Sequence, residues 1–220
     1  PMLAPVLGAI IIKVADWKMT FLVLAILTGF TLVGAFLLQE TLPVKERTQS
    51  STIQTILGLR KVAKNPNFSS LLLVGALIAA PFMAYLALAS YIYIDGFGVS
   101  ETTFSMYFAS NAAASILGPV MYMRFGAGSV KKVINVGIIV AIISAILILT
   151  VGNASPIIFL LSYVLYSIMT SYFRPLISDL LLSSTKTDVG AASSVMNFGF
   201  TVIGSIGMVV GSLQWSSYTG

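Results

Sequence analysis

The chain contains no cysteine and no histidine, and charged residues make up only 9% of its 220 positions. The missing side chains exclude disulfides, cysteine or histidine nucleophiles, and zinc sites or proton relays built on either residue. The charged share is also too small for the surface of a soluble domain, in which about a quarter of the residues are charged. We therefore expect no metal or cofactor, and we expect the chain to lie in a lipid bilayer.

Hydrophobic residues make up 57% of the sequence, and most of them are gathered in long runs. Apolar runs of about 18 residues or more are typical of membrane-spanning helices. The sequence therefore predicts an all-α transmembrane bundle. Its spanning segments are expected at about 19–39, 69–94, 103–123, 133–151, 156–182 and 189–213.

A seventh apolar stretch, Met2–Ile12, is too short to cross a bilayer at about 1.5 Å per residue. It follows Pro1 and not an initiator methionine, so we interpret it as the second half of a helix, and the sequence as a piece of a longer protein. The alternative is a cleavable signal peptide. Such a peptide carries basic residues before its apolar run, and none stands here.

Basic residues are sorted between the loops, and this sorting predicts the orientation. Nine of them lie in three alternate loops: Lys45, Arg47, Arg60, Lys61, Lys64, Arg124, Lys131, Lys132 and Lys186. The remaining loops carry only Lys18, with Lys13 at a helix end. Because cytoplasmic loops carry such an excess, loops 40–68, 124–132 and 183–188 are predicted to face the cytoplasm. The net charge of +5 is explained in this way without a nucleic-acid partner.

The loop 40–68 is the one long connection, and it contains a helix signal of its own. Residues 51–54 have the spacing of a capping box, and Asn65-Pro66 would end the helix. We predict a short amphipathic helix on the cytoplasmic membrane surface, with its basic end near anionic headgroups. Such a loop would divide the chain into the end of a first bundle (1–39), a linker (40–68) and most of a second bundle (69–220).

Polar side chains within the spans are candidates for function, because a polar group in hydrocarbon costs free energy unless it is buried in protein or faces water. They form stripes on four spans, whereas 133–151 is apolar almost all round and is expected to face lipid. Six residues are predicted to line a substrate path: Tyr85, Tyr107, Asn111, Tyr166, Arg174 and Asn197. The alternative for such residues is hydrogen bonding between helices, which requires no cavity.

Arg174 is the most informative of the six. It lies about nine residues before the cytoplasmic end of its span, or about 13 Å deep, near the limit that snorkelling relieves. One interpretation is structural: an ion pair with Asp179, or bonds to backbone carbonyls freed by Pro175. The other is a charge that borders the substrate path.

Small residues are concentrated on two spans. Residues 109–115 with Gly118-Pro119 give one span a thin face, and Gly199, Gly204, Gly207 and Gly211 do the same for the last. Close helix packing is the first interpretation of such faces, because membrane helices associate through van der Waals contact. Helix sliding is the second.

Four short motifs carry a resemblance to a known family. Residues 4–9 (Ala-Pro-Val-Leu-Gly-Ala) resemble the end of the antiporter signature in helix five of major facilitator superfamily drug/proton antiporters, with Ala9 in place of the usual last glycine. Residues 39–43 (Gln-Glu-Thr-Leu-Pro), 91–100 and 190–194 resemble helices six, seven and eleven of the bicyclomycin-resistance (Bcr/CflA) branch. The similarity runs in order through essentially the whole chain.

The resemblance implies a twelve-helix transporter of two six-helix bundles, of which this chain would cover a partial helix five to helix eleven. It implies alternating access around a cavity between the bundles. Pro5 and Gly8 would pack on the other bundle near 103–123 and seal the cavity during the switch. The partners implied are protons, a small lipophilic substrate and the lipid bilayer, for a protein that is monomeric at full length. The acidic residues that bind the proton in such antiporters lie outside this chain.

Two other classes of function fit the sequence less well. A receptor of the rhodopsin type would need a lysine in the last span, and an intramembrane enzyme would need paired acids or a Ser–Lys dyad, neither of which is present. A carrier for a sugar or another small metabolite is the main alternative. Abundant Tyr, Phe and Met favour an apolar or amphipathic solute. The sequence thus predicts a multidrug efflux antiporter of the bacterial inner membrane, for lipophilic and also cationic compounds.

Overall fold

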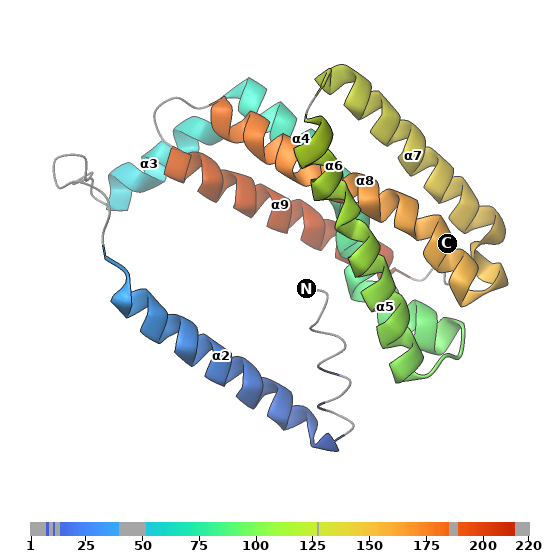
Figure 1. Cartoon of the computed structure of the whole chain (residues 1–220). Coiled ribbons are helices and arrows are strands. Elements are labelled where there is room, and N and C mark those ends of the chain that lie inside the picture. Colours follow the sequence, from blue (N-terminus) through green and yellow to red (C-terminus); the bar gives the residue numbers. More distant parts are fainter. Residues whose placement is uncertain are drawn as a thin grey trace.

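The computed structural model describes residues 14–39, 52–126, 128–184 and 189–213, together with Gly8 and Ile11. The elements named within these ranges are all helical (Figure 1). They are α2 (Trp17–Leu37), α3 (Thr52–Ala63), α4 (Pro66–Ser90) with its π-helical continuation η2 (Tyr91–Gly96), α5 (Glu101–Ser115), α6 (Leu117–Phe125), α7 (Val130–Val151) with the short 3₁₀ turn η3 (Gly152–Ala154), α8 (Pro156–Ser183) and α9 (Val189–Gly211).

Five of these helices are long and apolar enough to cross a membrane: α2, α4 with η2, α7 with η3, α8 and α9. The spans predicted at these places are confirmed to within a few residues at each end. The all-α transmembrane class is confirmed with them, since the described ranges contain helices and no strand.

The segment predicted as one span at 103–123 is a broken helix. The chain leaves α5 at Ser115 and enters α6 at Leu117, and the amide of Ile116 bonds to the carbonyl of Ala113 at 3.2 Å in a tightened turn. Pro119 has no N–H to offer the carbonyl of Ser115, so the α-helical ladder is interrupted at this point. The prediction of a continuous helix was wrong, although the two pieces together have a spanning length.

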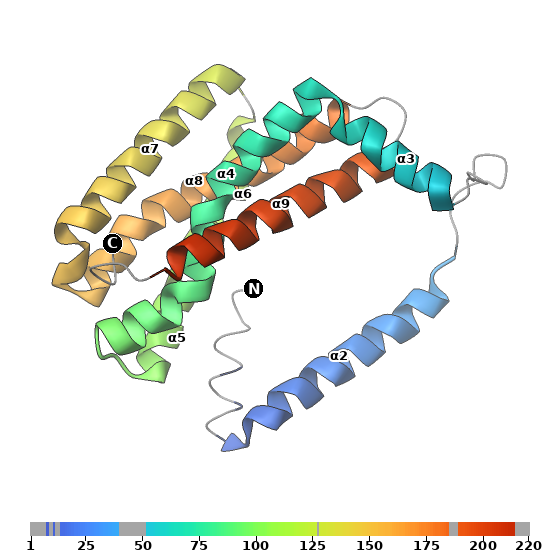
Figure 2. The same ribbon diagram turned by 180° about the vertical axis from the view of Figure 1, so that it is seen from behind.

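α4 and α8 form the centre of the bundle. Helix α9 packs along α4, α7 packs along α8, and both α5 and α6 pack on α8 (Figures 1 and 2). Because α8 touches neighbours on several sides, it holds eleven buried residues, more than any other helix described. The side chains between these helices form two apolar clusters, one around Phe173 and Ile177 and the other around Tyr93 and Tyr163.

The small residues of α9 lie against α4, as close packing requires. A Cβ on Gly204 would meet Met83, one on Gly207 would meet the backbone carbonyl of Ala80, and one on Gly211 would meet Leu88 and Ala84. The absence of side chains lets the two helices approach closely, which is the usual role of such positions in membranes. The packing interpretation of this face is therefore confirmed.

The predicted amphipathic helix is present as α3, which packs on α9 and α4 through Leu59 and Val62. Ile53, Ile56 and Leu57 remain exposed on its outer side. Helix α2 lies apart from this bundle in both views, and all its side chains except Thr20 are mostly exposed (Figures 1 and 2). The division of the chain at 40–68 stays a prediction.

Candidate functional site

An aromatic cluster fills the end of the bundle where α4 passes into η2. The rings of Tyr85 and Tyr163 stack with centroids 4.0 Å apart, and those of Tyr93 and Tyr107 stack at 5.2 Å. Phe159 closes the cluster from the start of α8. Two residues predicted to bind substrate, Tyr85 and Tyr107, thus lie within a packed group of rings, and Tyr85 is buried there.

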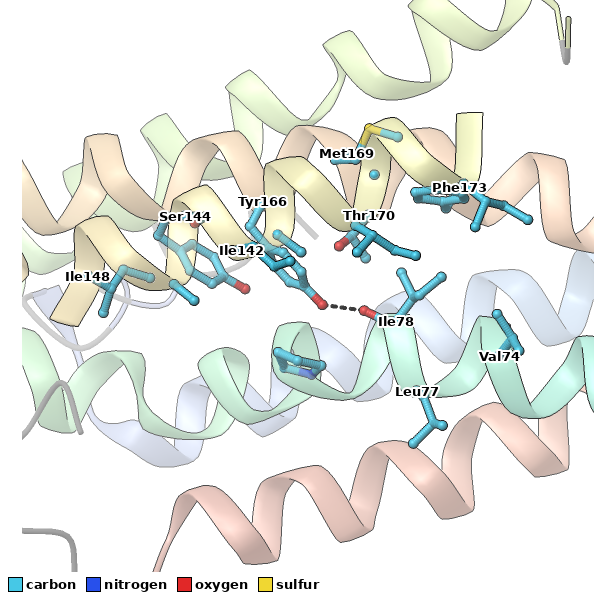
Figure 3. Close-up of a pocket in the computed structure, with 17 residues that line it drawn as sticks. Val74, Leu77, Ile78, Ile142, Ser144, Ile148, Tyr166, Met169, Thr170 and Phe173 are labelled. Atoms are coloured by element: carbon cyan, nitrogen blue, oxygen red, sulfur yellow. Dashed lines mark hydrogen bonds between the residues drawn. The ribbon is translucent and has the colours of Figure 1, made fainter. Parts of the chain in front are cut away.

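Tyr166 joins the two central helices. Its hydroxyl donates a hydrogen bond to the backbone carbonyl of Ile78 on α4 (Figure 3). Pro81, within the next turn of α4, lacks the N–H that a helical residue would offer, and such a proline loosens the ladder around it. Tyr166 is buried at the contact between α4 and α8. Its hydroxyl donates its hydrogen bond within the protein and not to a solute.

A pocket of about 560 Å³ lies on the α7 side of this contact (Figure 3). Its walls come from α4, α7 and α8, and Leu77, Ile138 and Ile142 among them are about half exposed. Ser144 lies at its edge, but its hydroxyl is bonded to the carbonyl of Ser162. Tyr163 and Thr170 also line the pocket, and their hydroxyls are buried without a partner among the described residues. The lining is otherwise apolar, so the pocket suits mainly apolar groups. The prediction that 133–151 faces lipid agrees with the exposed apolar face of α7.

A second, smaller pocket lies on the other side of the α4–α8 contact, between α4, α8 and α9. It has a volume of about 90 Å³, and its apolar walls include Phe82 and Met83 of α4 and Phe200 of α9. Arg174 of α8 is exposed at this pocket. Within the described ranges Arg174 forms no ion pair, and Asp179 instead accepts a hydrogen bond of 3.4 Å from the hydroxyl of Tyr122. The Arg174–Asp179 pair considered above is not formed.

Asn197 lies on an exposed polar stripe of α9. Its amide donates to the carbonyl of Ser193, and the hydroxyls of Ser194, Thr201 and Ser205 each donate to a carbonyl one turn back in the same helix. These bonds leave the oxygen atoms of the stripe as acceptors on an exposed surface. Hydrogen bonding from this stripe to another helix is not seen in the ranges that the structure covers.

Asn111 has the opposite environment. It lies on α5, is only 3% exposed, and its Oδ1 atom has no hydrogen-bond partner among the described residues. Beyond the break, Gly118 of α6 touches the backbone of α8. Ser167 of α8, on which α5 packs, has a hydroxyl that is likewise buried without a partner among the described residues.

Replacing Asn111 with leucine is expected to stabilise the protein and to lower its transport activity. A buried acceptor without a partner costs about 1–3 kcal/mol, and a leucine of similar volume removes this cost. We expect the thermal midpoint of the purified full-length protein to rise by a few degrees. Asn197→Leu, on the exposed stripe, is the control and should leave the midpoint near that of the parent. A lower midpoint for Asn111→Leu would mean that the amide is bonded in the whole protein.

Of the two residues predicted to act in the conformational switch, the structure describes only Gly8. Pro5 lies outside the described residues. Gly8 is helical, and a Cβ added to it would meet nothing within 4 Å. Their role in sealing the cavity stays a prediction, as does substrate binding by the six residues named from the stripes.

The structure adds residues that the sequence patterns did not single out. Phe82, Met83 and Phe200 line the pocket of Arg174. In the sequence, these apolar residues cannot be distinguished from the other apolar residues of their spans. A weak signal did exist for two of them, because Phe82 and Met83 directly follow Pro81, where a spanning helix bends. The sequence shows Tyr93 and Tyr163 as polar residues within spans, but it does not show that they lie at the centre of an aromatic cluster.

Comparison with known proteins gives a consistent result. The family model described as Major Facilitator Superfamily matches residues 1–212. The chain is 30% identical over 214 residues to an uncharacterized MFS-type transporter, YdgK, of Bacillus subtilis (strain 168), covering 94% of this chain and 53% of that protein. It is 22% identical over 219 residues to the multidrug resistance protein MdtM of Salmonella typhimurium, covering 98% of this chain and 53% of that protein.

The chain thus spans about half the length of these two relatives. The family match covers nearly all of the chain and agrees with the spanning helices and with the bundle built from them. It points to a transporter and away from an enzyme. The chain is a multi-pass membrane protein that belongs to the major facilitator superfamily.

Proposed function

We propose that the full-length protein is a secondary active efflux transporter that exchanges lipophilic compounds for protons by alternating access. The observation that carries the proposal is the pocket between α4, α8 and α9, whose lining includes Phe82, Met83 and Phe200 and a single charged side chain, Arg174. Aromatic and thioether groups bind by contact area and adapt to different shapes. Such a wall suits solutes that share lipophilicity more than a fixed pattern of hydrogen bonds.

The arrangement of helices supports a protein that changes conformation. Helix α4 contains Pro81, α6 contains Pro119 and α8 contains Pro175, and these helices adjoin the pocket or pack on its walls. Helices with such breaks can bend at defined points because the backbone bonds there are already missing. We propose that the bundle rocks against a second one, with Pro5 and Gly8 at their contact.

The relatives support drug efflux only in part. One is named as a multidrug resistance protein, at 22% identity, and the other is an uncharacterized transporter. We place the protein in the bacterial inner membrane as a monomer, with the three basic loops in the cytoplasm, and in the Bcr/CflA branch on the motifs given above. Tyr85, Tyr107, Asn111, Tyr166, Arg174 and Asn197 are the proposed substrate-binding residues.

A carrier for a sugar or another small metabolite is the second candidate. The exposed stripe of Ser194, Asn197, Thr201 and Ser205 favours it, since a sugar requires many hydrogen-bonding groups. Against it, the three hydroxyl donors and one of the two amide N–H donors of Asn197 are already used within α9. The stripe therefore offers several acceptors but only one remaining N–H donor, which is a poor match for a solute that needs many of both.

The test is a drug-susceptibility panel in a bacterium that lacks its major efflux pumps and expresses the full-length parent gene. We expect resistance to several unrelated lipophilic drugs to rise about fourfold or more, and to be lost when a protonophore dissipates the proton gradient. An export ratio of this size corresponds to less than about 1 kcal/mol of driving free energy, which a proton gradient supplies easily. Unchanged susceptibility across the panel, with the protein present in the membrane, would favour the metabolite carrier.

A further inference from the structure

We propose that Arg174 binds the anionic group of the transported compound, and that the substrate class is amphipathic organic anions: a carboxylate or sulfonate carried on an aromatic or aliphatic body. The proposal rests on the proposed export function and adds to it the charge of the solute. It departs from the expectation of cationic compounds drawn from the sequence, because the pocket itself carries a positive charge.

The first step is the electrostatic environment of Arg174. A charge inside a spanning helix is tolerated where it meets water or a counter-ion, and Arg174 is exposed and has no ion pair within the described ranges. Of the four acidic residues that the structure describes, Asp16 precedes α2, and Asp95 and Glu101 lie beyond α4, more than ten residues past Met83. The fourth, Asp179, lies five residues after Arg174 and accepts a hydrogen bond from the hydroxyl of Tyr122. The pocket therefore attracts anions and repels cations.

The second step is the chemistry of the guanidinium group. Its planar fork of N–H donors matches the two oxygens of a carboxylate or sulfonate, and such charged, bidentate pairs are stronger and more directional than neutral hydrogen bonds. None of the hydrogen bonds found for the described residues uses the side chain of Arg174. It is thus available as a donor to a solute.

The third step is the size and the lining of the pocket. At about 90 Å³ it is much smaller than the several hundred Å³ that hold a whole drug-sized ligand. It can hold a headgroup or one ring of the solute, in contact with Phe82, Met83 and Phe200 of its lining. A small subsite with one charge and apolar walls selects for an anionic group attached to an apolar one.

A different partner for Arg174 is a carboxylate from the part of the transporter that this chain does not contain. In that arrangement Arg174 would be neutralised within the protein, and the charge of the solute would not matter to it. The experiment separates these two roles, because it changes the charge of the solute on one ring system and then removes the charge of the protein.

The experiment measures transport by the full-length protein in proteoliposomes with an imposed proton gradient. The three probes share one ring system: 1-naphthaleneacetate, 1-naphthaleneacetamide and 1-(1-naphthyl)ethylamine. The variants are Arg174→Gln and Arg174→Lys. Arg124→Gln is the matched control, because it removes the same charge from an exposed position at the cytoplasmic end of α6.

We expect the parent to transport the carboxylate about tenfold faster than the amine at equal concentration. A tenfold ratio is what one charged hydrogen-bonded pair between solute and protein would contribute. Arg174→Gln should lose this preference and still transport the amide, Arg174→Lys should keep part of it, and Arg124→Gln should keep all of it. Equal transport of all three probes by the parent, or an unchanged ratio in Arg174→Gln, would overturn the anion proposal alone. No transport of any probe by a protein that raises resistance in the drug panel would overturn the anion proposal alone, whereas failure in both experiments would overturn the proposed export function as well.

Discussion

Replacing Gly118 with leucine is expected to remove the folded protein almost completely. Gly118 lies where α6 crosses α8, and an added Cβ would lie 2.6 Å from the amide nitrogen of Tyr172 and 2.8 Å from the carbonyl carbon of Ser171. These neighbours are backbone atoms of a central helix, so no side chain can move aside. Overpacking that a site cannot relieve costs about 3 kcal/mol or more, a large part of the stability of a domain.

The measurement is size-exclusion chromatography of the full-length protein fused to a fluorescent reporter. Gly118→Leu should give no monodisperse peak, and Gly118→Ala should give a reduced one, because the alanine already brings the clashing Cβ. Gly152→Ala is the control, since the added Cβ would lie 3.5 Å from the nearest atom, a side-chain methyl carbon of Ile148, which is an ordinary van der Waals contact. A sharp peak for Gly118→Leu, equal to that of the control, would show that α6 and α8 do not approach each other as closely as they do in this structure.

The spans and the linker helix could be predicted because their signals are local. A run of apolar residues fixes where a helix can cross the bilayer, and α3 is bounded by residues that begin and end helices. The break at Ile116 was missed although Pro119 was visible. Membrane helices tolerate proline when neighbours satisfy the freed carbonyls, so the sequence alone does not decide between a gentle bend and two helices. Here the contact of Gly118 with α8 fixes the position of the crossing.

The candidate site was less predictable, for a different physical reason. Stripes of polar residues identify the sides of a helix that avoid lipid, and Asn111 and Tyr166 do lie between helices. A stripe cannot tell whether a side chain meets another helix or an open pocket, because that depends on helix crossing angles and on the side chains opposite. Tyr166 meets the carbonyl of Ile78, whereas Arg174 meets the pocket of Phe82 and Phe200. Only the three-dimensional arrangement separates the two cases.

Replacing Tyr93 with alanine is expected to have the second-largest effect on stability. Tyr93 is completely buried, and four aromatic rings surround its own: Phe97, Phe104, Tyr107 and Phe159, with centroid separations of 5.2–6.1 Å. The substitution leaves a cavity that rigid neighbouring rings cannot fill. Truncating a buried aromatic residue to alanine costs about 3–5 kcal/mol. We expect the thermal midpoint of the purified full-length protein to fall by roughly ten degrees.

Tyr93→Phe is the matched control, because it keeps the ring and removes only the hydroxyl. If ring packing holds η2 against α5 and α8, the phenylalanine variant should unfold within a few degrees of the parent and the alanine variant far below it. Equal losses in the two variants would assign the effect to the hydroxyl instead. A small loss in both would show that this end of the bundle opens without cost to the rest. The cluster would then be a mobile part of the cavity wall, and Tyr85 and Tyr107 would be free to meet a solute.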